Sequence, residues 1–212
     1  MHACRQDTLN GAGITLADGN TIDFIRIQET PGDAIFGNGV NGATISNCEI
    51  ANLTNNGSGI QDDRATGNWT ISNNAMSGVD SIGIFLNGQT GDSLVAIIAD
   101  NEITGSSGGA MSFSYLGSGM MRAQIVRNVM TGTTNPGATF EAQAFNTASI
   151  CFDIEGNNND DAYSISRDVA SATIEVEELD ILTTINTGSA IVTTLGGSLA
   201  PTRVDDGACG PF

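Results

Sequence analysis

The 212-residue sequence predicts an all-β solenoid, in which short strands stack coil upon coil along one axis. Two ladders of mostly apolar residues recur at intervals of 24 to 28 residues, which is the length of one coil. Glycine is frequent, helix formers are scarce, and Thr, Ile, Val, Asn and Ser abound, so strands joined by tight turns are favoured. Self-similarity at this period indicates that each repeat packs on its neighbours.

The two ladders run about half a repeat out of phase. The members of the first ladder are Ile45, Ile71, Ile98, Ile125, Ile150 and Ile174. The members of the second ladder are Ile35, Ile60, Ile84, Met111, Ala138, Tyr163 and Ile191. We expect each ladder to form a buried stack with about 4.8 Å between coils.

A second apolar residue and a polar column accompany the first ladder. Five residues after it come Ile50, Met76, Ile103 and Met130, which we expect to point inward. Three residues after it come Cys48, Asn74, Asn101, Asn128 and Asp153. Asparagines stacked at one turn can hydrogen-bond along the axis and tolerate left-handed backbone geometry. The sequence therefore predicts a structural ladder of Asn74, Asn101 and Asn128.

The phrases ISNNxMxG and SIGIFLNG, read from residues 71–78 and 81–88, resemble the right-handed parallel β-helix repeat of pectate-lyase-like proteins and of many bacterial surface and secreted proteins. The resemblance covers residues 21–195. It implies a single-stranded parallel β-helix of about seven coils, in one domain that spans residues 1–212. It implies no particular activity, because this architecture hosts lyases, hydrolases, epimerases, adhesins and phage spikes alike.

The two ends, residues 1–20 and 196–212, are less regular. Residues 1–20 show no amphipathic cap, and the segments IEVEELDIL and SAIVTTL after Ala170 are expected to be strands. An uncovered solenoid end exposes strand edges, so we expect self-association through the ends, unless a tail or a neighbouring domain of a longer parent protein covers them. The chain could be a fragment of such a protein.

Four cysteines, Cys4, Cys48, Cys151 and Cys209, are enough for a disulfide framework. Cys48 and Cys151 lie four coils apart, roughly 19 Å at the spacing of β-strands, which is too far for a disulfide. We therefore expect both to be unpaired. Cys4 and Cys209 lie at opposite ends, so they could bridge only through a folded-back tail or between molecules.

The formal net charge is −17, and all seven basic residues are arginine. Such a surface repels nucleic acids and anionic membranes. The longest apolar run, Leu94 to Ala99, is too short to span a membrane, and the start of the chain shows no signal peptide. Because acidity suits a crowded, salty exterior, we expect an extracellular or cell-surface protein.

One carboxylate breaks the inward pattern. Two residues after the second ladder the series reads Gly37, Asp62, Leu86, Phe113, Phe140 and Ile165. A buried carboxylate is costly unless it is paired, protonated or at a local break. Asp62, Asp63 and Arg64 are therefore candidate catalytic residues. The competing interpretation is a turn that begins at Asp62, with Arg64 in a surface ion pair.

Four neighbours of this segment are candidate ligand-binding residues. Phe36 and Phe85 are predicted to point outward about 9.6 Å apart with Gln61 between them, and Asn38 and Asn87 share the column of Asp63. Such a face could bind a polysaccharide.

Other acidic residues suggest an ion pair and a cation site. Asp100 and Arg127 are one coil apart and are expected to pair. The doublets Asp160-Asp161 and Asp205-Asp206, with Asp168 and Glu155, could ligate calcium, although no known calcium-loop motif is present. The pattern requires no cofactor.

These observations favour a non-catalytic extracellular module that acts as a structural or adhesive rod. The only histidine is His2, outside the repeat, and aromatic content is 5%. The alternative is a lyase, a glycosidase or a glycan-binding module that uses the Asp62 segment. Ice binding is disfavoured because the outward series is too irregular: Thr44, Thr70, Ile97, Gln124, Ser149 and Thr173.

Overall fold

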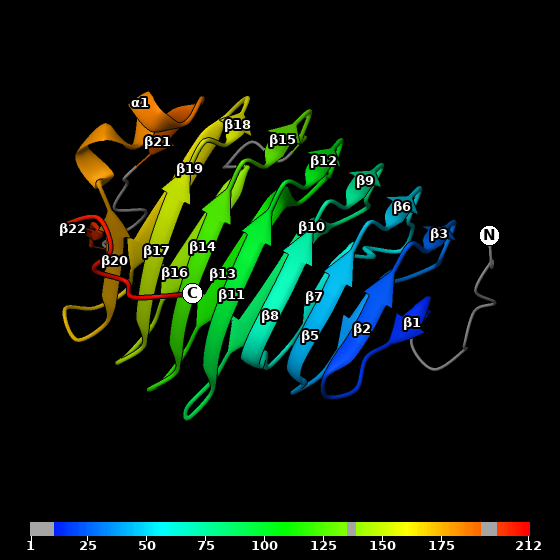
Figure 1. Cartoon of the computed structure of the whole chain (residues 1–212), viewed down its shortest axis with the longest axis horizontal. Helices are drawn as coiled ribbons and strands as arrows, with labels where there is room; N and C mark the ends of the chain where they lie inside the picture. Colours follow the sequence, from blue (N-terminus) through cyan, green and yellow to red (C-terminus); the bar gives the residue numbers. More distant parts are fainter. Residues whose placement is uncertain (1–10, 135–138, 192–198) are drawn as a thin grey trace.

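The computed structural model describes residues 11–134, 139–191 and 199–212. It is a parallel β-solenoid of about six turns, close to the predicted number of coils (Figure 1). Three parallel sheets run along its length, and each turn of the chain contributes one strand to each sheet in most coils. All-β solenoid architecture is thus confirmed.

Sheet I contains, in spatial order, β1 (Ile14–Thr15), β4 (Ile35–Gly37), β7 (Ile60–Asp62), β10 (Ile82–Gly88), β13 (Gly109–Tyr115), β16 (Phe140–Ala144), β19 (Ala162–Arg167) and β21 (Ser189–Ile191). Sheet II contains β2 (Asn20–Asp23), β5 (Asn41–Ser46), β8 (Thr66–Ser72), β11 (Ser93–Ala99), β14 (Met120–Val126), β17 (Ser149–Glu155), β20 (Thr173–Glu177) and β22 (Thr202–Val204). Sheet III contains β3 (Arg26–Gln28), β6 (Glu49–Ala51), β9 (Ala75–Ser77), β12 (Glu102–Thr104), β15 (Val129–Thr131) and β18 (Asn158–Asn159).

The first ladder forms a buried stack in sheet II, with one correction. Ile45, Ile71, Ile98 and Ile125 align coil by coil and are buried, as predicted. The next member is Ile154, whereas Ile150 aligns with Met121 and with Ile174. Ile150 and Ile174 are buried and aligned with each other as predicted, but their placement in the same stack as Ile125 was wrong. Ile150 and Ile154 both point inward on β17, so either one fits an alternating pattern. Because the coil that leads to β17 is longer than the preceding ones, Ile154 lies opposite Ile125.

The second ladder lies in sheet I and also needs correction after its first half. Ile35, Ile60, Ile84 and Met111 align as predicted. Phe140 follows Met111 and Tyr163 follows Phe140, whereas Ala138 lies outside the described residues. At the end of the sheet Ala190, not Ile191, aligns with Tyr163. The inward series shifts accordingly, with Ala142 between Phe113 and Ile165.

The core lies between the three sheets. In sheet III the predicted column of Ile50, Met76, Ile103 and Met130 is in register and buried. Toward the C-terminal half the core becomes aromatic, because Phe113, Phe140, Phe152 and Tyr163 pack with ring centroids 5.5 to 5.7 Å apart.

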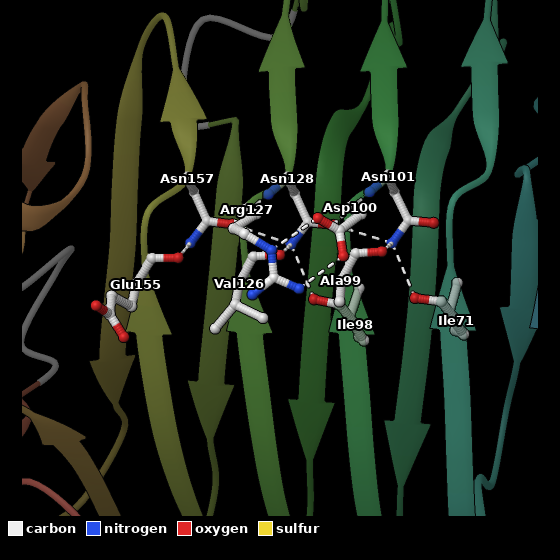
Figure 2. A network of polar contacts seen from close by, with 10 residues as sticks. All are labelled: Ile71, Ile98, Ala99, Asp100, Asn101, Val126, Arg127, Asn128, Glu155 and Asn157. Carbon is white, nitrogen blue, oxygen red and sulfur yellow. Dashed lines mark hydrogen bonds and ion pairs between the residues drawn. The ribbon is translucent and has the colours of Figure 1, made fainter.

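A continuous asparagine ladder runs inside the turn that joins sheet II to sheet III (Figure 2). Asn74, Asn101 and Asn128 are buried, and each Nδ2 donates to the Oδ1 of the next member at 2.9 Å. The ladder continues through Asn157 to Asn186, so the predicted member Asp153 was wrong. Asp153 is three residues after Ile150, whereas the residue in register with Ile125 is Ile154, and Asn157 is three residues after Ile154.

Each ladder amide also ties the backbone of two coils together. The Nδ2 of Asn101 donates to the carbonyl of Ile71 at 2.9 Å, while its Oδ1 accepts the backbone N–H of Asn74 at 3.1 Å. The same pattern repeats at Asn128 and Asn157. A buried amide with all of its groups paired stabilises the turn, and the low-polarity surroundings strengthen the bonds.

The left-handed backbone predicted for the ladder belongs to the residue before it. Positive φ angles are found at Asn47, Asn73, Asp100, Arg127 and Gly156, each of which immediately precedes a ladder position. Asparagine, aspartate and glycine tolerate this geometry well, whereas arginine adopts it less readily. In this turn, which we call the corner, one residue has the left-handed backbone conformation and the next provides the side-chain amide.

The C-terminal end differs from the prediction. Residues 179–185, within and after the segment IEVEELDIL, form a short 3₁₀ helix, η1 (Leu179–Ile181), and a helical turn, α1 (Leu182–Ile185), instead of a strand. Asn186 at the end of α1 closes the ladder by donating to the carbonyls of Ile154 and Leu182. A helical turn thus takes the place of the last strand of sheet III, as seen beside β18 in Figure 1.

The prediction that Cys48 and Cys151 do not form a disulfide is confirmed, but the expectation that Cys151 is unpaired was wrong. Cys48 is buried and free, and no Cys48–Cys151 disulfide forms. Cys151 is bonded to Cys209, with Cα atoms 5.5 Å apart. The C-terminal tail folds back over sheet II, which brings the two cysteines together. Cys209 is therefore not available for the predicted bridge to Cys4, which lies outside the described residues.

We predict that Asn101→Ala lowers the free energy of unfolding by about 2 to 4 kcal/mol, because it leaves several buried backbone and side-chain groups unpaired. The measurement is chemical denaturation monitored by circular dichroism. The matched control is Asn68→Ala at an exposed position of β8, which should change stability by no more than about 0.5 kcal/mol. Equal effects of the two substitutions would contradict the structural importance of the ladder.

Candidate functional site

The predicted site residues gather on and beneath the outer face of sheet I, across β4, β7 and β10. Gln61 aligns with Phe36 on one side and with Phe85 on the other. Asn38 and Asn87 follow the residues aligned with Asp62, so they flank Asp63. We call these six residues the Asp62 face: Phe36, Asn38, Gln61, Asp63, Phe85 and Asn87.

Asp62 itself points away from this face into the protein. It is the last residue of β7 and is fully buried. Its Oδ1 accepts the backbone N–H groups of Arg64 at 2.8 Å and Gly39 at 3.2 Å, and its Oδ2 accepts that of Val40 at 3.2 Å. The carboxylate thus caps the turns that follow β4 and β7.

The surroundings of Asp62 are fitted to a carboxylate. Gly37 aligns with Asp62 in the neighbouring strand, and a Cβ atom at Gly37 would collide with Oδ2. Burial raises the pKa of Asp62, and the three backbone N–H donors oppose this shift without cancelling it. Asp63 adds a smaller rise through its negative charge.

Arg64 forms the surface ion pair of the competing interpretation. Its Nη2 lies 3.1 Å from Oδ1 of Asp92, and its Nε lies 3.3 Å from Oδ2. Asp92 also accepts the backbone N–H of Gln89 at 2.8 Å, and its side chain is only 7% exposed. The hydrogen bond to Asp92 raises the pKa of Arg64.

Sequence reasoning missed Asp92 and Tyr115 as members of this polar cluster. Asp92 is 28 residues after Arg64, one coil further on, in a Gln-Thr-Gly-Asp turn, and that spacing was the available signal. Tyr115 is buried and donates from its hydroxyl to the carbonyl of Ala65 at 3.2 Å. Nothing in the local sequence distinguishes this tyrosine from the apolar residues of the core.

The outer part of the site is a shallow surface of rings and amides. Phe36 and Phe85 are half-buried, and Gln61 donates from Nε2 to Oδ1 of Asp63 at 2.9 Å. Asn38 is exposed. The Oδ1 of Asn87 is buried and has no hydrogen-bond partner among the described residues. This surface has the composition of a binding face more than of a proton-transfer site.

The geometry limits the chemistry that these residues can perform. Asp62, at the end of β7, and the next residue, Asp63, point to opposite faces of the sheet, so they cannot flank one bond of a substrate. Asp62 has no exposed surface, and Arg64 is engaged by Asp92. The structure therefore brings Phe36, Gln61, Asp63 and Phe85 together and separates Asp62 from them.

The other acidic candidates are placed as follows. Asp100 and Arg127 form the predicted ion pair through two contacts of 2.7 and 2.8 Å, and Arg127 lowers the pKa of Asp100 (Figure 2). Asp160 accepts the N–H of Gly132, and Asp168 accepts that of Asn146.

Two calcium candidates, Glu155 and Asp206, line one small acidic hollow near the C-terminal end. In the described ranges, no three His, Cys, Asp or Glu side chains are arranged to hold a metal ion. Calcium binding stays a prediction. Within the same ranges, no helix has the length and apolar character needed to cross a membrane.

Comparisons with protein-family models, with curated proteins and with solved structures found no match to the chain.

We predict that Asp62→Ala lowers the free energy of unfolding by about 2 kcal/mol, because the backbone N–H groups of Gly39, Val40 and Arg64 lose their buried acceptor. Thermal and chemical unfolding measure the effect. Asp63→Ala is the matched control, since its side chain lies on the outer face and should change stability by no more than about 0.5 kcal/mol. A stability gain in Asp62→Ala would show that desolvation of the carboxylate outweighs its hydrogen bonds.

Proposed function

We propose that the chain is a non-catalytic β-solenoid module that serves as a structural or adhesive rod at an extracellular or cell-surface location. The observation that carries this proposal is the use made of the candidate catalytic residues. The Asp62 carboxylate caps two backbone turns, and Arg64 is paired with Asp92. Because these side chains already bind structural partners, a structural role is favoured over a catalytic one.

The axial interactions give the rod its stiffness. Every coil is joined to the next by three parallel strand pairs along most of the length and by the amide ladder. Because each coil is hydrogen-bonded in register to the coils on either side, such a module can present a partner surface at a fixed distance.

Self-association through the ends is part of this proposal. Sheets I, II and III terminate at β1, β2 and β3 on one side, and edges of this kind can pair with a further chain. Among the described residues both ends are acidic. Asp18, Asp23 and Glu29 lie near the first turn, and Glu178 and Asp206 lie near the last, where Asp180 and Asp205 share an ion pair with Arg203. Like charges oppose end-to-end contact at low salt.

We therefore predict that the average mass in solution rises with both protein concentration and ionic strength, because salt screens the repulsion between the acidic ends. Sedimentation velocity and negative-stain electron microscopy provide the measurement, with short linear stacks as the expected product. A strict monomer at high salt and high concentration would exclude assembly and leave the adhesive role alone.

Glycan binding is the second candidate, and it rests on the aromatic pair. Phe36 and Phe85 are two strands apart on the outer face, at roughly 9.6 Å, with the amide of Gln61 and the carboxylate of Asp63 beside them. Rings at this spacing can stack on sugars of one chain while the polar groups bind hydroxyls.

We predict that any polysaccharide retained by the protein in affinity electrophoresis loses at least about tenfold in affinity in Phe36→Ala/Phe85→Ala. The matched control is Phe24→Ala, because Phe24 is 79% exposed but lies in the turn after β2, away from this face. The same samples are assayed for new reducing ends and unsaturated products. Product formation that is lost in Asp62→Ala would contradict the non-catalytic proposal and identify the chain as an enzyme.

A further inference from the structure

The C-terminal tail forms a strap across the outer face of sheet II. After β22, residues 205–212 run back over β20 and β17 toward β14 (Figure 1). The buried Glu177 carboxylate accepts the backbone N–H groups of Gly207 at 3.0 Å and Cys209 at 2.7 Å. The Cys151–Cys209 disulfide adds a covalent link to β17. The strap is thus fixed in place at two points.

A hollow of about 460 Å³ lies between this strap and the sheet. Its floor and walls come from β11, β14, β17 and β20 and from the strap itself, and they include Val95, Met120, Arg122, Cys151, Glu175 and Gly210. The size is within the range of small-molecule sites. Met120 is 54% exposed and provides an apolar side chain to the opening.

Arg122 gives this hollow its charge. Four of the arginines in the described ranges form ion pairs with carboxylates: Arg26, Arg64, Arg127 and Arg203. Arg167 donates to three backbone carbonyls. Arg122 instead donates from Nη1 to the carbonyl of Cys209 at 3.2 Å and has no carboxylate at ion-pair distance in the described part of the chain.

The strap also positions the Arg122 guanidinium. Gly210 has a φ of +81°, and a Cβ atom at that residue would lie 2.7 Å from Nη1 of Arg122. Another residue at this position would be strained by the positive φ, and its Cβ atom would displace the guanidinium from this place. Glu175 occupies the same outward column two strands further along, roughly 9.6 Å away, because Arg122 aligns with Cys151 and Cys151 aligns with Glu175.

We propose that this hollow binds an organic monocarboxylate, whose charged end pairs with Arg122 and whose apolar part lies against Val95 and Met120. The Arg122 guanidinium presents a planar fork of N–H donors that matches the two oxygens of a carboxylate. Glu175 repels a second negative charge at the far side, which favours ligands with one carboxylate. The proposal is independent of the rod function.

The test uses the 212-residue chain with hexanoate as the probe and hexanamide as its neutral counterpart. Isothermal titration calorimetry or NMR chemical-shift titration measures the affinity for each. We expect hexanoate to bind and hexanamide to bind at least about tenfold more weakly, because a charge-assisted hydrogen bond is lost.

The variants separate the guanidinium from the apolar floor. Arg122→Gln should weaken hexanoate binding at least about tenfold, and Met120→Ala should weaken hexanoate and hexanamide by a similar factor. Arg26→Gln is the matched control, since it removes an exposed arginine from sheet III and should leave binding unchanged. Circular dichroism verifies that each variant keeps its fold.

A parallel titration with glucuronate distinguishes an acyl carboxylate from a sugar carboxylate. Binding of either probe that is lost in Arg122→Gln supports the proposal and identifies the source of the carboxylate. The proposal is overturned if neither probe binds at millimolar concentration, or if the affinity is the same in Arg122→Gln as in the unmodified protein.

Discussion

The hydrogen bonds between successive coils are the interaction on which the rest of this structure depends. A coil buries little on its own, and its apolar residues become a core only when the coils above and below are in register. Register is set in part by the amide ladder, because an asparagine one position out of line could not reach both the amide and the carbonyl of its neighbours. The stacks of isoleucine then follow from this alignment.

The sequence predicted the architecture well because several sets of residues, apolar and asparagine, each recur independently at the length of one coil. The first four members of each apolar ladder and the asparagines at 74, 101 and 128 are where their spacing placed them. The errors begin where a coil changes length. Between Ile125 and Ile154 the chain gains residues, and Ile150 offered an equally apolar inward alternative. Periodicity alone cannot choose between two inward residues of one strand.

The site was predicted less completely because the roles of its side chains depend on partners that have no sequence signature. Asp62 was identified as an inward carboxylate, and it is one, but the donors that satisfy it are backbone N–H groups of Gly39, Val40 and Arg64. Asp92 and Tyr115 join the cluster only through the stacking of coils. The disulfide was missed for the same reason, since Cys209 reaches Cys151 through the path of a tail that no repeat specifies.

The corner that pairs a left-handed residue with a ladder asparagine has a consequence for how such a protein can change over evolution. The same two-residue junction recurs at Asn73-Asn74, Asp100-Asn101 and Arg127-Asn128. Cutting the gene at any two of these junctions and rejoining it would connect compatible backbones and leave the amide ladder unbroken. Recombination at this turn can therefore add or remove whole coils. The length of the solenoid then changes while the packing of its core is kept.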